Sequence, residues 1–108
     1  MESDLVFSDL APFLDRDGRL LSFPATHKKK LMALWYLAGK IERNRQYTEP
    51  EINALLDEWT LFHDPATLRR ELYHNRLLDR AADGSSYQKA GSIPAFEEFI
   101  KSGGRNNG

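Results

Sequence analysis

The sequence contains no cysteine, no long apolar run and no glycine-rich phosphate loop, and each absence excludes a class of protein. Without cysteine the chain can form neither a disulfide framework nor a thiolate metal site. Its longest apolar run, LMALWYLAG (31–39), has about half the length that a bilayer span requires. The start, MESDLVFSDL, lacks the basic and then apolar pattern of a secretion signal. We therefore expect a cytoplasmic protein with no membrane partner.

Residue patterns typical of enzymes and metal proteins are also missing. His27, His63 and His74 do not have the spacing of metal ligands. Adjacent carboxylates occur as Asp57-Glu58 and Glu97-Glu98, where solvation on a helix surface explains them. Serines lie in turns without the context of a nucleophile elbow. We expect no catalytic residue, no metal and no cofactor, and we predict that the protein is not an enzyme.

The length and the charge pattern bound what remains. A chain of 108 residues with 41% hydrophobic residues has the size of one domain with a modest core. The net charge of −1 hides blocks: five acids and two bases in 1–24, one acid and six bases in 25–48, five acids and no base in 49–64, and three acids and five bases in 65–91. Attraction to nucleic acid depends on the local electric field at one face, so a net charge near zero with such blocks does not exclude nucleic-acid binding. Alternatively, they neutralise one another within the fold.

The first part of the chain is predicted to be an extension followed by a helix. Residues 1–24 suggest a short helix or turn to about Leu14 and a brief extended stretch at 19–23, which covers the core or carries a partner surface. Thr26 offers a cap oxygen to a helix whose apolar residues recur at intervals of three and four to Ile41.

The middle of the chain predicts a helix–turn–helix. Thr48 followed by Glu51 matches the capping box at the start of a helix that ends near Trp59. Asp64-Pro65 then supplies an N-cap with proline at the first helical position. Because the link between the two helices is short, we interpret 48–76 as a helix–turn–helix.

A β-hairpin is predicted directly after this motif. Residues 77–80 and 87–89 read as strands around the Asp83-Gly84 turn, and 45–47 is placed to be a third strand. A last short helix is expected around Phe96, within a single domain (1–101) that ends in a flexible tail (102–108). The predicted fold class is mainly α with a small antiparallel hairpin, a winged helix–turn–helix.

The outward face of the helix that begins at Pro65 is the candidate binding surface. Leu68 and Leu72 define its buried side, which leaves arginine, tyrosine, threonine and histidine pointing outward. Arginine can fork onto guanine, and threonine and tyrosine can meet phosphate or a thymine methyl. The predicted face comprises Thr67, Arg70, Tyr73 and His74, with Arg69 at its edge, and further phosphate contacts are predicted from Arg80, Lys89, Lys28, Lys29 and Lys30.

A structural interpretation of the same residues stands beside the functional one. Exposed arginines often contact only water or pair with nearby carboxylates, which here include Asp57, Glu58 and Glu71. One of the two adjacent arginines is a candidate tether between the two helices. The three lysines lie where the helix dipole disfavours cations, so they either reach a partner or mark a solvated helix start.

Four stretches carry a resemblance to a known family: FPA-x-x-KKK (23–30), YTEPEIN (47–53), DPATLRREL (64–72) and LLDRAADGSSY (77–87). With them the chain resembles the bacterial domain of unknown function 2087 family, from about Asp15 to Tyr87. The resemblance implies a winged-helix fold and an association with transcription regulators, because the family occurs alone or joined to regulator domains. It implies no established activity or ligand.

We therefore predict a winged-helix transcriptional regulator that binds double-stranded DNA. We expect a homodimer, because one small helix seldom buries the surface that specific DNA binding needs. The apolar N-terminal segment or the helix carrying Phe96, Phe99 and Ile100 would supply the dimer surface. The alternative is a module of the same shape that binds a regulatory protein and no nucleic acid. The acidic block at 49–64, which would repel phosphate, favours this alternative.

Overall fold

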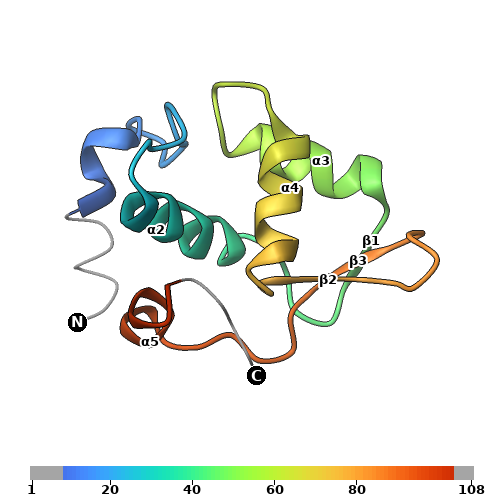
Figure 1. The fold of residues 1–108 in the computed structure, drawn as a ribbon. Coiled ribbons are helices and arrows are strands. Elements are labelled where there is room, and N and C mark those ends of the chain that lie inside the picture. Colours follow the sequence, from blue (N-terminus) through green and yellow to red (C-terminus); the bar gives the residue numbers. More distant parts are fainter. Residues whose placement is uncertain (1–8, 104–108) are drawn as a thin grey trace.

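The computed structural model describes residues 9–103, which form a mainly helical fold with a small three-stranded antiparallel sheet (Figure 1). The predicted sequence of helices and strands from 26 to 100 is confirmed. In chain order the elements are the 3-10 helix η1 (Ala11–Phe13), α2 (His27–Ala38), β1 (Gln46–Tyr47), α3 (Glu49–Glu58), α4 (Pro65–His74), β2 (Leu78–Arg80), β3 (Tyr87–Lys89) and α5 (Phe96–Lys101).

The sheet has the strand order β1-β3-β2, and its register decides which side chains face the helices. Tyr47 pairs with Tyr87, which also pairs with Arg80, and Leu78 pairs with Lys89. Paired residues point to the same side of a sheet, and side chains alternate along each strand. The side with the buried residues therefore holds Tyr47, Leu78, Arg80, Tyr87 and Lys89, and the other side holds Gln46, Asp79 and Gln88.

Local hydrogen bonds fix the start of α3 and the end of α4. The Glu51 backbone N–H donates to the Thr48 hydroxyl over 3.2 Å, and the Thr48 backbone N–H donates to the Glu51 carboxylate over 2.8 Å. This predicted capping box is confirmed, and the bond from the Thr48 backbone is the main cause that lowers the pKa of Glu51. At the other end Arg76 adopts φ 58°, and the Leu77 N–H bonds to the Leu72 carbonyl over 2.9 Å. This left-handed cap turns the chain from α4 into β2.

The N-terminal segment completes the core, as expected for part of the 1–24 extension. Leu10 and Leu20 are fully buried within the same hydrophobic cluster as α2. The Leu20 N–H donates to the Trp59 carbonyl over 2.8 Å, and its carbonyl accepts from the Leu61 N–H over 2.9 Å. These bonds fasten the segment to the link between α3 and α4. Residues 1–8, and 104–108 of the predicted tail, lie outside the described residues.

Two local expectations are wrong. Phe96 and Phe99 of α5 are buried at 5% and 0% exposure against the rest of the chain, and the Phe96 ring meets Trp35 edge-on at 5.5 Å. These aromatics therefore cannot form the dimer surface predicted for this helix. Thr26 occupies the N-cap position of α2, but its side chain makes no capping hydrogen bond.

The two N-cap threonines form a matched pair for a stability measurement. We expect Thr48→Ala to lower the free energy of unfolding by about 1 kcal/mol, because it removes the hydroxyl that caps α3. Thr26→Ala removes a hydroxyl that makes no capping hydrogen bond, so it should lower the free energy of unfolding by only a few tenths of a kcal/mol. Urea unfolding followed by circular dichroism measures both. Equal losses in the two variants would contradict this assignment of the caps.

Candidate nucleic-acid interface

Arg69 points into the protein and connects three elements. One guanidinium nitrogen donates to the Asn53 side-chain oxygen over 2.5 Å, and another lies 3.5 Å from a Glu49 carboxylate oxygen. The guanidinium also lies 5.8 Å from the centre of the Tyr87 ring, and the side chain is only 15% exposed. The prediction that Arg69 lies at the edge of the outward face is therefore corrected. It is the tether between α3 and α4 that the structural interpretation anticipated.

Arg70 points about 100° away from Arg69 on the same helix and is exposed. Its side chain makes no hydrogen bond or ion pair with any residue between 9 and 103. Tyr73, which is 42% exposed, and His74 follow on the next turn, with their rings 6.0 Å apart. The Arg80 guanidinium from β2 lies 5.4 Å from the centre of the Tyr73 ring. The structure thus brings together most of the predicted face, and we call Arg70, Tyr73, His74 and Arg80 the α4 face.

Two features border the α4 face. Thr67 is half-buried in the first turn of α4, and its backbone N–H donates to the capping Asp64 carboxylate over 3.4 Å. A hollow of about 340 Å³ adjoins Tyr73 and His74, and Asp79 lies on its wall. The negative charge of the Asp79 carboxylate would repel an anionic partner at this hollow.

Lys89 does not lie on the outer surface of the hairpin. It is half-buried on the side of the sheet that faces the helices, in a pocket with Trp35 and Arg43. Desolvation lowers the pKa of Lys89, and the Arg43 guanidinium lowers it further. The prediction of Lys89 as a phosphate contact of the wing is corrected. The signal was available in the sequence, because Lys89 follows the aromatic Tyr87 at the two-residue period of a strand.

The three lysines at the start of α2 are also remote from the hairpin. Figure 1 shows the N-terminal end of α2 beside η1, on the far side of the view from β2 and β3. The Lys29 ammonium lies 5.5 Å from the centre of the Phe13 ring, and that of Lys30 lies 5.6 Å from Phe23. Both cover aromatic residues of the N-terminal segment, and Lys28 is exposed. The structure therefore does not gather Lys28, Lys29 and Lys30 with the α4 face.

The acidic block at 49–64 has bases beside it. Glu49 meets Arg69, Asp57 lies 3.3 Å from His63, and Glu51 lies 4.0 Å from Arg45. The two arginines thus neutralise part of this block within the fold, as the alternative interpretation of the charge pattern expects.

Metal clusters and membrane-spanning helices are both absent from the described part of the chain. Residues 9–103 contain no cluster of three or more histidine, aspartate or glutamate side chains that could hold a metal ion. None of the helices in this range combines the length and the apolar character needed to cross a bilayer.

Comparison with known proteins places the chain in a family of unknown function. The model of a family described as "uncharacterized protein conserved in bacteria (DUF2087)" matches residues 19–89, which is more than half of the chain. The chain belongs to this bacterial family, as its sequence motifs indicated. No curated protein and no solved structure gave a significant match.

The two adjacent arginines should differ sharply in their effect on stability. Arg69→Met leaves Asn53 and Glu49 without their cation, and we expect it to lower the free energy of unfolding by about 1–2 kcal/mol. Arg70→Met changes an exposed side chain that has no ion-pair partner among residues 9–103, and the variant should stay within about 0.5 kcal/mol of the wild type. Urea unfolding of both variants measures the difference. A loss for Arg70→Met equal to that for Arg69→Met would contradict the inward placement of Arg69 alone.

Proposed function

We propose that this protein is a cytoplasmic transcriptional regulator without enzymatic activity, which binds double-stranded DNA through the α4 face. The order of elements supports the proposal, since α3 and α4 can serve as a helix–turn–helix and the hairpin that follows α4 as its wing. The observation that carries it is the exposed Arg70, which makes no ion pair with a described residue and lies one turn before Tyr73, the residue whose ring the Arg80 guanidinium approaches.

The chemistry of these side chains fits a DNA groove. A guanidinium that is not paired with any carboxylate of residues 9–103 is available to fork onto the O6 and N7 acceptors of guanine. Arg80 lies over the Tyr73 ring at 5.4 Å, which holds its charge beside α4, where a phosphate would pass. Histidine and tyrosine on the same turn add hydrogen-bond donors to phosphate or base edges.

The supporting structure suits presentation of α4 as a rigid unit. Leu68 and Leu72 are fully buried, and the Arg69 tether holds the helix to α3. A helix fixed in this way loses little freedom when it binds, which favours affinity. The outer side of the sheet offers Gln46, Asp79 and Gln88, so the positive contribution of the wing comes from Arg80 at its edge.

A second candidate function is binding to another protein, either a second copy of this chain or a regulatory partner. Leu21 and Leu61 are 44% and 38% exposed. They belong to two neighbouring segments, which are joined by the hydrogen bond from the Leu61 N–H to the Leu20 carbonyl. Exposed leucines next to each other are typical of protein contact surfaces.

Fluorescence anisotropy with a labelled random duplex tests DNA binding. We expect the affinity to fall steeply as salt rises, because bound cations displace condensed counterions from DNA. Arg70→Ala should weaken binding by about 1–3 kcal/mol, and Arg80→Ala should reduce the slope of log affinity against log salt by about 1. Arg16→Ala, which removes an exposed arginine from the N-terminal segment, is the matched control and should change neither quantity.

An opposite change sharpens the test. Asp79→Asn removes the carboxylate beside the α4 face and should strengthen binding by about twofold to fivefold at low salt, since like charge repels phosphate. No binding at low salt by the folded protein would overturn the proposal and favour the protein-interaction module. Equal effects of Arg16→Ala and Arg70→Ala would show attraction to net charge and not to this face.

A further inference from the structure

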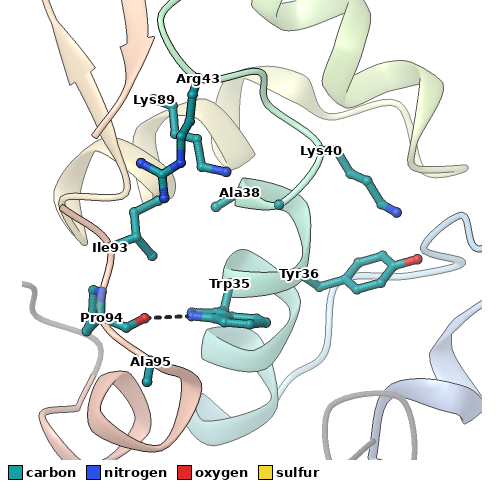
Figure 2. Close-up of a pocket in the computed structure, with 10 residues that line it drawn as sticks. Trp35, Tyr36, Ala38, Lys40, Arg43, Lys89, Ile93, Pro94 and Ala95 are labelled. Carbon is teal, nitrogen blue, oxygen red and sulfur yellow. Dashed lines mark hydrogen bonds between the residues drawn. The ribbon is translucent and has the colours of Figure 1, made fainter. Parts of the chain in front are cut away.

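A pocket of about 430 Å³ lies on the opposite end of α2 from its lysines, where α2, the loop after it, β3 and the approach to α5 meet. Figure 2 shows its lining, with the Trp35 indole below and the side chains of Arg43 and Lys89 above. Ile93, Pro94 and Ala95 form the side toward α5. Its volume falls within the range of sites that hold small organic ligands.

The charges in this pocket are of one sign. Its lining includes arginine and lysine side chains but no aspartate or glutamate. Neither Arg43 nor Lys89 makes an ion pair with a carboxylate anywhere in residues 9–103. Lys89 is half-buried, and its pKa is lowered by desolvation and by the neighbouring Arg43. The exposed Arg43 and the half-buried Lys89 thus line one pocket without a carboxylate from residues 9–103, and an anionic ligand would balance their charge.

Lys40, the third cation of the lining, is directed elsewhere. Its ammonium lies 4.7 Å from the centre of the Tyr36 ring and 4.2 Å from that of Trp59. In Figure 2 it points to the side of Tyr36, away from Arg43 and Lys89. The positive charge inside the pocket therefore comes from two residues.

The remaining wall is apolar, and its one indole N–H already has a hydrogen-bond acceptor in the protein. The Trp35 indole N–H donates to the Pro94 carbonyl over 3.1 Å, and the ring packs edge-on against Phe96. Its N–H is thus used within the protein, and its face offers an apolar surface for stacking. With Ala38 and Ile93 beside it, this wall suits an aromatic or aliphatic group and not a sugar.

We propose that this pocket binds a small amphipathic anion, whose carboxylate or phosphate contacts Arg43 and Lys89 while its apolar body packs on Trp35 and Ile93. A guanidinium and an ammonium on one side and an indole on the other match the two ends of such a molecule. The site would give the protein a binding function for a metabolite-sized ligand, which is separate from the α4 face and does not depend on DNA binding.

The probe for the test is 1-naphthaleneacetate, with 1-naphthaleneacetamide as its neutral counterpart. In a titration of the ¹⁵N-labelled protein, we expect the Trp35 indole N–H signal to shift and that of Trp59 to stay, with a dissociation constant of about 1 mM or lower. The amide should bind about tenfold more weakly, because it lacks the charge. Hexanoate and 1-naphthyl phosphate, as further probes, distinguish an aliphatic body from an aromatic one and a carboxylate from a phosphate.

Three variants assign the charge. Arg43→Gln and Lys89→Met should each weaken binding of 1-naphthaleneacetate by about tenfold. Lys40→Met is the matched control, because it removes a cation of the lining that points away, and should leave the affinity unchanged. Circular dichroism establishes that each variant is folded, and Lys89→Gln replaces Lys89→Met if the latter is not.

Three results would overturn the proposal: no shift of the Trp35 signal with any of the anions, equal affinity for the acid and the amide, or the same loss for Lys40→Met as for Arg43→Gln. Competition with duplex DNA gives a fourth. If duplex displaces the probe from the wild-type protein and from Arg70→Ala alike, Arg43 and Lys89 are phosphate contacts of DNA and not a small-molecule site.

Discussion

The contact on which the rest of this fold depends is the burial of the Arg69 guanidinium among Asn53, Glu49 and Tyr87. A charge that is largely removed from water needs partners on several sides, and here they come from α3 and from β3. The same contact neutralises one carboxylate of the acidic helix and fixes the rotation of α4 about its axis. Because residues next to each other on a helix point about 100° apart, holding Arg69 inward turns Arg70 outward. The architecture and the candidate interface thus have a common cause.

The distribution of cations follows from similar constraints on the sheet. Residues Arg80 and Lys89 both lie on the side of the sheet that carries its buried residues, since the register pairs them with Tyr87 and Leu78. Arg80, at the end of its strand, reaches past the core to Tyr73 of α4. Lys89, at the other end of the hairpin, meets the end of α2 and Arg43. One short hairpin therefore supplies a positive charge to two separate surfaces, the α4 face and the pocket.

Local signals in the sequence were sufficient to predict the elements. The capping box at Thr48, the Asp64-Pro65 start and the Asp83-Gly84 turn depend on neighbouring residues, so they can be read without knowledge of the fold. The candidate site was predicted only in part, because the direction of a long charged side chain depends on partners distant in sequence. Helical spacing alone contains no information about Asn53, which holds Arg69 inward, and the sequence of α2 does not show that Lys29 and Lys30 lie over Phe13 and Phe23.

The pocket and the α4 face are connected through the β2–β3 hairpin. Trp35 and Lys89 line the pocket, and Lys89 pairs through β3 with Leu78, which begins the strand that carries Arg80. An anion between Arg43 and Lys89 would relieve their mutual repulsion and favour the conformation in which the end of α2, β3 and the approach to α5 are held together. A ligand shifts an equilibrium only by its difference in affinity for the two states. Coupling to the α4 face therefore requires that the position of the hairpin relative to α4 differs between the free and the bound pocket. Such a difference would change the contact between the Arg80 guanidinium and the Tyr73 ring.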